Sequence, residues 1–420
     1  MAAVRGIRCR SAFWVLVAAL TLAIALGGVS SAQTTLSVWG LWGSGTSYEA
    51  VRTIMDRFQA ENPDVVIEYT PIRHAEYIEK VLLGHVSGTG PDVLFLADEW
   101  FESAYRAGIL SPLPRDFEEE IREAFYANPL TIGEREGVLY GIPTEFNLYV
   151  LMWNQDLFDE AGIAGPPEKW EEWRLYAQRL TRRDADDRIT RAGLNMYFGG
   201  GSDFTTFFAN LLATNGHEGY PDDLTRINLT DPLAIETLEF VQELYLQHRV
   251  WEPGAPGYAT GNLAMTITHY GDSGNLRRNV PALFESSHIA TIPRNRGDHA
   301  NLFWGWAITV PLSAKHPDEA WRFVRYFTNS ENTGYFADTK GHIITRRDTF
   351  HTFRDHWIDQ EPTLVQYATA HAAWHPAWDH VYDIAGPLLL KATQGEISAV
   401  EALANITDQV RAVALEAEGR

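Results

Sequence analysis

The sequence predicts an α/β protein built from two doubly wound lobes that a hinge connects. Three observations carry this expectation. Short β-type runs alternate with amphipathic helical patterns along the chain. About 390 residues follow Ala32, which is more than a single hydrophobic core usually organises. No long linker rich in Pro, Gly or Ser separates the two halves, so short crossings must join them.

The first three strands and their helices predict the first lobe. After a strand at residues 36–39 and a turn, we expect a capping box at Thr46 and Glu49 to open a helix that Asn62 and Pro63 end. A strand at 65–69, a helix at 76–86 and a strand at 92–97 follow. The last strand is almost wholly apolar, which suits the buried middle of a parallel sheet.

A second series of strands and helices starts near residue 141 and predicts the second lobe. Its expected elements are a strand at 149–153, a helix striped by Trp170, Trp173, Ala177 and Leu180, and a helix capped by Asp231 and Pro232. After Leu302 we expect another strand at 304–310 and a helix with Ala320, Val324 and Phe327 on one face, and the chain ends in a helix opened by Ser398 and Glu401.

The first 32 residues have the features of a secretory leader. Arg5, Arg8 and Arg10 precede an apolar run at residues 12–26, and the small residues 30–32 fit a signal peptidase. We expect cleavage after Ala32, which makes the mature protein periplasmic or extracellular. The only cysteine, Cys9, precedes the apolar run and cannot serve as a lipoprotein anchor.

The charge of the chain bears on its partners. The formal net charge is −21, and loss of the three leader arginines makes the mature chain more negative. An acidic surface repels nucleic acid and anionic membranes, so we expect neither as a partner. The same acidity is ordinary for a soluble surface and identifies no ligand.

Several motifs follow one another across the mature chain. Gly261 precedes the run Leu263-Ala-Met-Thr-Ile-Thr-His269. The other motifs are Phe58 to Pro63 with the strand at 65–69, Lys80 through Gly88 to Asp92, Ala104 to Leu113, Leu139-Tyr-Gly-Ile-Pro143, and Trp153 to Gly162 with Pro167 and Trp170. Together they resemble the motifs of extracellular solute-binding protein family 1, the maltose-binding-like proteins of sugar ABC transporters.

The resemblance implies a periplasmic-binding-protein-like fold of type II, in which the chain crosses the hinge more than once. It implies an N-terminal lobe of residues 33–143 with 302–342, and a C-terminal lobe of 144–301 with 343–420. Such a protein captures a sugar or oligosaccharide by hinge closure and delivers it to the membrane permease of an ABC importer. We expect a monomer that needs no cofactor or metal and catalyses no reaction.

A sugar ligand needs aromatic rings against its C–H faces and carboxylates or amides around its hydroxyls. Ligands of doubly wound sheets bind beyond the carboxyl ends of the strands, which places residues 39–42 and 98–100 at the site. The candidate ligand-binding residues are Trp39, Trp42, Asp98, Glu99, Glu145, Asn147, Asp203 in the loop 199–203, Tyr270, Asp272, Trp304, Trp306 and Arg346. Core packing is the alternative role for each tryptophan.

Two departures from the family pattern affect the ligand. Gly271 lies where relatives often carry a stacking tryptophan, so either Tyr270 replaces that ring or the ligand differs. After Gly341, a Gly-x-x-Pro turn is replaced by a run that ends in Arg346 and Arg347. These arginines could hold a phosphate or carboxylate, which leaves a phosphorylated polyol such as glycerol 3-phosphate as an alternative ligand. The other reading is a solvated basic turn.

A secreted glycoside hydrolase is the alternative from a different class. Asp98 and Glu145 could act as the paired carboxylates of glycosidic cleavage. Against this, the family that the motifs resemble uses such acids to hold hydroxyl groups. The sequence has no Gly-rich phosphate loop, which excludes the ATPase of a transporter.

Two further patterns resemble catalytic or metal motifs. Residues 271–274 match most of the nucleophile string of chymotrypsin-like proteases, but Asn275 replaces its last glycine and the α/β pattern offers no β-barrel. His371 and His375 have the spacing of a zinc-binding pair, but Ala372 stands where that motif needs glutamate.

Overall fold

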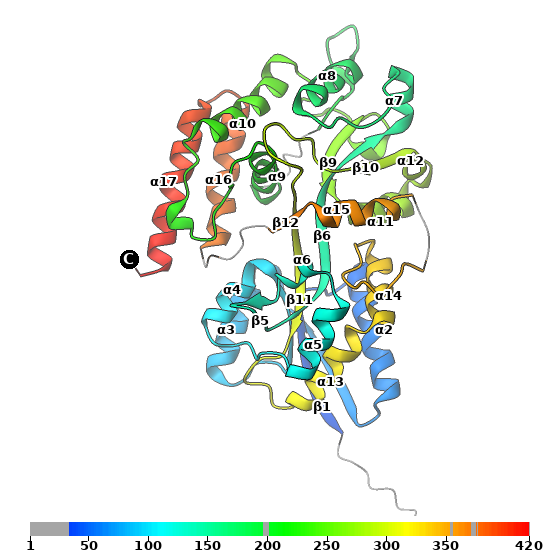
Figure 1. The fold of residues 1–420 in the computed structure, drawn as a ribbon, viewed down its shortest axis with the longest axis vertical. Coiled ribbons are helices and arrows are strands. Elements are labelled where there is room, and N and C mark those ends of the chain that lie inside the picture. Colours follow the sequence, from blue (N-terminus) through cyan, green and yellow to red (C-terminus); the bar gives the residue numbers. More distant parts are fainter. Residues whose placement is uncertain (1–32, 196–200, 353–355, 371–374, 376, 420) are drawn as a thin grey trace, which may run out of the picture.

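A mixed sheet of eight strands runs the length of the molecule (Figure 1). The computed structural model describes residues 33–195, 201–352, 356–370, 375 and 377–419. Strands β2 (Val65–Pro71), β1 (Thr34–Gly40) and β3 (Val93–Ala97) are parallel neighbours. Strand β11 (Asn301–Thr309) runs antiparallel between β3 and β6 (Ile142–Asn154), and β6 also pairs antiparallel with β9 (Met265–His269) and β10 (Ser287–Ala290). Strand β12 (Ala368–Ala370) extends β11 in parallel.

Helices cover this sheet in two groups, one around each end (Figure 1). The lower group is α2 (Gly45–Glu61), α3 (Tyr77–Ser87), α4 (Asp98–Arg106), α5 (Arg115–Ala124), α6 (Ala127–Leu130), α13 (Pro317–Phe327) and α14 (Ser330–Lys340). The upper group is α7 (Gln155–Ala161), α8 (Trp170–Leu180), α9 (Gly201–Thr214), α10 (Pro232–Gln242), α11 (Asp272–Asn279), α12 (Pro281–Ser286), α16 (Trp378–Thr393) and α17 (Ala399–Ala417). Helix α15 (Glu361–Gln366) lies between the groups, and two short hairpins complete the fold, β4–β5 (Glu134–Arg135, Val138–Leu139) and β7–β8 (Arg182–Arg183, Ile189–Arg191).

Two large hydrophobic cores give the molecule its two lobes. The first packs β1, β2 and β3 against helices such as α2 and α13, where the rings of Phe58 and Phe323 lie 5.2 Å apart. The second packs α8, α9, α10, α16 and α17 around β9. Strand β6 belongs to both, since Leu148 is part of the first core and Leu151 part of the second. The two-lobed α/β architecture expected from the sequence is therefore confirmed.

Helix ends show which local signals hold. Asp231 accepts the backbone N–H groups of Leu233 and Ala234, and Ser398 accepts that of Glu401, as their capping patterns predict. The capping box expected at Thr46 is wrong. Helix α2 already begins at Gly45 with Ser44 at its N-cap, so Thr46 lies inside the first turn and no side chain caps the helix.

The three strands and two helices predicted for the first lobe form where their patterns predict them. Every residue of β3 is buried, as its apolar run indicates. Within the described part of the chain, no helix combines the length and apolar character that crossing a membrane requires.

Candidate functional site

The carboxyl ends of β1 and β3 bring aromatic and acidic side chains together. Asp98 and Glu99 open α4 directly after β3, and Trp42 lies in the turn after β1. The ring of Trp42 packs 5.0 Å from Trp306 of β11 and 5.3 Å from Phe95. Burial, followed by the nearby charge of Glu99, raises the pKa of Asp98 to about 8, so this carboxyl is mostly protonated at neutral pH.

Strand β6 contributes a buried polar group to the middle of the molecule, where β6 passes from one core to the other. We call the region around Glu145, Lys340 and His342 the waist. Glu145 pairs with Lys340 at the end of α14, and its Oε2 lies 3.5 Å from Nδ1 of His342. Burial raises the pKa of Glu145 and lowers that of Lys340, although each partner opposes the shift of the other. Glu145 Oε2 and His342 Nδ1 have no hydrogen-bond partner in the described part of the chain.

A pocket of about 350 Å³ lies beside β9, next to this buried group. Its lining residues are Tyr149, Phe207, Thr266, Ile267, Thr268, His269 and Asp272. The ring of His269 lies 4.4 Å from Tyr149 and 5.6 Å from Trp304, and Trp304 lies 6.4 Å from His342. Aromatic rings, a hydroxyl and a carboxylate therefore surround one space, which is the chemistry that holds a polar ring-shaped ligand.

Helix α16 of the second lobe faces the first turn of α4. Burial, and then the charges of Glu99 and Asp98, hold the pKa of Tyr382 well above its usual value. Because both carboxyls act on this phenol, the two lobes present polar side chains to each other here. Trp378 lies 5.8 Å from Tyr382 and 5.5 Å from Tyr220, so α16 adds an aromatic cluster.

Comparison with known proteins decides the family. A profile of bacterial extracellular solute-binding proteins matches residues 42–334, which is more than half of the chain. The chain belongs to this family. It is 22% identical to a putative binding protein of Brucella abortus over 344 residues, or 78% of this chain and 80% of that protein. It is also 22% identical to an arabinooligosaccharide-binding protein of Bacillus subtilis, over 76% of each chain.

The fold is shared with solved structures. A sugar-binding protein from Xanthomonas citri superposes with a TM-score of 0.77 at 19% identity, over 92% of this chain and 98% of that one. Members of the family bind solutes, so this chain is a binding protein and not an enzyme. No comparison supports the glycoside hydrolase or the phosphorylated-polyol alternative.

The structure brings only some of the sequence-predicted residues of this solute-binding protein together. Near the waist and the pocket it places Trp42, Asp98, Glu99, Glu145, Asn147, Asp272, Trp304 and Trp306. Asn147 accepts the backbone N–H of Gly271 at 3.0 Å. Trp39 reaches instead toward α3, where its ring lies so close to Gly84 that a Cβ added to this glycine would be 3.1 Å from it.

Two predicted residues have other surroundings. Tyr270 is 3% exposed and donates its hydroxyl to Glu361 at 2.6 Å, so its ring packs in the first core and does not take the place of a stacking tryptophan. Arg346 is buried and forms two hydrogen bonds of 2.8 Å with Asp348 and one of 2.7 Å with the carbonyl oxygen of Thr328. Its guanidinium is thus neutralised within the protein.

The loop 199–203 can be placed only in part. Residues 199 and 200 lie outside the described residues, whereas Asp203 belongs to the first turn of α9, with its side chain outside the description. The protease-like string at 271–274 is the start of α11, where Ser273 is buried and donates to the carbonyl oxygen of Gly341 at 3.4 Å. That serine therefore has a structural hydrogen-bond partner.

Sequence reasoning missed five residues of the waist and the pocket, which are Tyr149, His269, Lys340, His342 and Tyr382. Three had a usable signal. His269 ends the Ala-Met strand, and Lys340 and His342 flank the Gly341 turn at the expected crossing. Tyr382 had none, because only the tertiary fold turns α16 toward α4.

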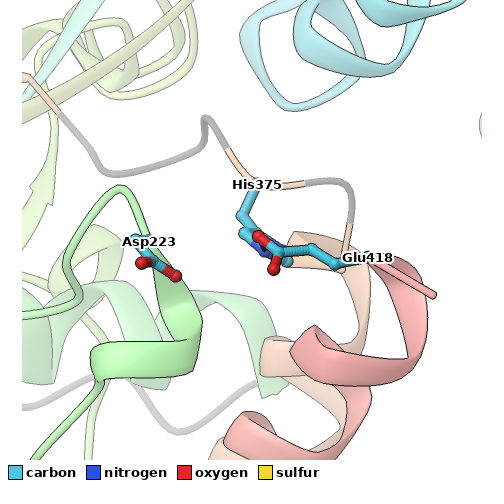
Figure 2. A group of neighbouring side chains, drawn as sticks. All are labelled: Asp223, His375 and Glu418. Atoms are coloured by element: carbon cyan, nitrogen blue, oxygen red, sulfur yellow. Dashed lines mark ion pairs between the residues drawn. The ribbon is translucent and has the colours of Figure 1, made fainter. Parts of the chain in front are cut away.

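The histidine of the zinc-like pattern lies in a different cluster, at the lower end of the second lobe. His371 lies outside the described residues, and His375 meets Asp223 and Glu418, with all three ligand atoms within 4.8 Å of one another (Figure 2). His375 Nε2 lies 3.5 Å from Glu418, but Nδ1 accepts the backbone N–H of Ala377 at 3.1 Å. In the neutral ring the proton is therefore on Nε2, which opposes metal binding through that atom.

Proposed function

We propose that this solute-binding protein captures a sugar or an oligosaccharide between its lobes and delivers it to the permease of an ABC importer. The observation that carries the proposal is the meeting of rings, carboxyls and a pocket at the waist, around Trp304, His269 and Asp272. The arabinooligosaccharide-binding protein of B. subtilis and the sugar-binding protein of X. citri support the ligand class. The chemical reason for this ligand class is that aromatic rings cover the C–H faces of a sugar and carboxylates accept hydrogen bonds from its hydroxyls.

Hinge closure is the mechanism. A ligand that touches both lobes only when they are closed shifts the open–closed equilibrium by its differential affinity for the two states. The proposed lobes are residues 33–143 with 302–342 and residues 144–301 with 343–420. The two cores support this division in the main, because the first draws on residues from Leu36 to Leu148 and the second on Leu151 to Ile267 and on Trp378 to Ala414.

The cores depart from this division in some places. Residues between Tyr270 and Ile289, and also Ile343, Trp357 and Leu364, are expected in the second lobe but belong to the first core, where Phe284 lies 5.4 Å from Trp357. These residues and the segment that leads to α15 lie next to the waist (Figure 1). In this part of the chain, the boundary between the two lobes is therefore an extended, packed region.

Export and assembly complete the proposal. The family is extracellular, which agrees with the leader features of residues 1–32. We propose cleavage after Ala32, no lipid anchor, a monomeric mature protein and an ABC permease as its partner.

Ligand screening of the mature protein tests the function. Thermal unfolding is measured with arabino-, manno- and malto-oligosaccharides, with monosaccharides and with glycerol 3-phosphate. A ligand that binds only the folded form at about 100 times its Kd adds about 2.7 kcal/mol to stability, so a rise in Tm identifies it. A positive sugar is then titrated calorimetrically, and small-angle scattering should show compaction at saturation. A rise with glycerol 3-phosphate alone, or no compaction, would contradict the proposal.

A further inference from the structure

A second pocket, of about 500 Å³, lies where the segment after α14 passes α15. It shares no lining residue with the pocket beside His269. The wall that contains Val365 is fixed to α6, because the side-chain amide of Asn128 donates to the carbonyl oxygens of Val365 and Ala368 at 3.0 and 3.3 Å. The volume lies within the range of small-molecule sites, roughly 300–1,000 Å³.

Two of the positive groups that line this pocket are already neutralised. Arg346 forms its two-pronged ion pair with Asp348. His351 bonds to Asp338 through Nδ1 and to Glu361 through Nε2, both at 2.5–2.9 Å. These two carboxylates raise the pKa of His351 to about 9 in spite of its burial, so the ring stays charged and paired at neutral pH. Neither group is free to hold an external anion.

Arg347 differs from both. It is exposed, it lines the pocket, and it forms no ion pair with any residue in the described part of the chain. Its guanidinium lies 5.8 Å above the ring of Tyr126, which also lines the pocket. A guanidinium offers parallel N–H donors that match a carboxylate, and a ring beneath it limits its rotation. Arg347 is therefore a cation at the rim that no carboxylate of the described residues neutralises.

The rest of the lining is apolar apart from Thr349, Gln366 and Glu361, and Glu361 is already paired with His351. Ile343, Ile344, Ile358, Pro362 and Val365 form the walls. Phe350 lies at the rim with 81% of its surface exposed, so its ring could cover the apolar face of a bound ligand. A sugar would bury hydroxyls against these walls without partners, which is costly. The lining instead favours a ligand with an apolar body and one negative end.

We propose that this pocket binds a small amphipathic carboxylate, whose anionic end meets Arg347 and whose one- or two-ring apolar body lies between Ile344 and Val365. The ligand differs from the sugar in class and in site, so the inference stands apart from the proposed function. The walls belong to the chain that leads from α14 to β12, which pairs with the waist strand β11.

Calorimetric titration of the mature protein with 2-naphthoate tests the proposal, with the neutral 2-naphthamide as a probe of equal shape. We expect one equivalent of naphthoate to bind, and the amide to bind at least tenfold more weakly. Arg347→Gln should reduce naphthoate to the affinity of the amide. Arg188→Gln is the matched control, since its side chain is 76% exposed and remote in sequence, and it should change nothing.

Two further variants separate this pocket from the sugar site. Val365→Trp fills the pocket and should abolish binding of both probes, whereas Trp304→Ala should leave naphthoate affinity unchanged. Equal affinity for acid and amide would overturn the inference, as would tight naphthoate binding by Arg347→Gln. Loss of naphthoate binding in Trp304→Ala would place the probe in the sugar pocket and would overturn it equally.

Discussion

The buried pair of Lys340 and Glu145 yields the sharpest prediction about stability. Their side chains are 7% and 1% exposed, so water screens the pair little. Lys340→Met removes the cation and leaves a buried carboxylate without compensation, which typically costs about 3–5 kcal/mol. An average domain has only about 5–15 kcal/mol of stability, so the variant should fold but unfold at a much lower urea concentration.

The pH dependence of this loss follows from the state of Glu145. Burial raises its folded-state pKa, and Lys340 opposes that shift, so the variant raises the pKa further. Between the ordinary and the raised pKa, the folded variant binds a proton that the unfolded chain does not. Stability of the variant therefore rises as pH falls through this window, by up to about 1.4 kcal/mol per pH unit. The deficit at pH 8 should exceed that at pH 5.5.

Urea unfolding of the mature protein at both pH values measures the effect. The double variant Lys340→Met with Glu145→Gln has no charge at this buried pair and should be more stable than Lys340→Met alone. Arg52→Met is the control, since it breaks a pair with Asp56 that is 46% and 57% exposed and should cost at most about 1 kcal/mol. A Lys340→Met deficit as small as the control, or equal at both pH values, would refute the reasoning.

Three other variants test the site. Trp304→Ala should weaken sugar binding about tenfold, or 1.4 kcal/mol, with little change in Tm, because this ring is only half-buried; a large drop in Tm would assign it to the core. Gly271→Ala should cost about 1–3 kcal/mol in urea unfolding, since its Cβ would lie 2.8 Å from the ring of His342, whereas Gly257→Ala meets no atom within 4 Å and should be neutral. Asp98→Asn should become more stable than the parent as pH rises toward 8, because the raised pKa of Asp98 makes its ionisation costly in the folded state; parallel pH profiles in unfolding would exclude this.

Local patterns predict the strand ends, and with them part of the site. The apolar run of β3 identifies a central strand, and the rule for parallel sheets then places Asp98 and Glu99 at its carboxyl end, where they lie. Composition and position identify both tryptophans of β11 as candidate ligand-binding residues. The sequence cannot distinguish the two, because Trp304 and Trp306 lie on the same strand face and only the fold gives them different neighbours.

The remaining site residues depend on contacts between distant parts of the chain. Glu145 and Lys340 are 195 residues apart, and no local pattern pairs them. The sequence predicts that Arg346 can bind an anion, because no local pattern indicates that Asp348, two residues later, pairs with it. The sequence predicts a missing tryptophan at Gly271, whereas the structure gives this glycine a role of its own. A Cβ there would lie 2.8 Å from the ring of His342 and 3.0 Å from the side-chain nitrogen of Asn147.

His342 gives a last prediction, because it connects stability to function. It is buried, its pKa lies well below the usual value because of burial and then Lys340, and its Nδ1 has no hydrogen-bond partner among the described residues. A buried polar atom without a hydrogen bond costs about 1–3 kcal/mol, a cost that a ligand hydroxyl can remove. His342→Phe keeps the ring but deletes the atom, so it should stabilise the ligand-free protein by about 1 kcal/mol and weaken sugar binding about tenfold. Urea unfolding and calorimetric titration measure the two effects. A variant that loses stability and keeps its affinity would show that the nitrogen serves the fold, and that the sugar binds elsewhere.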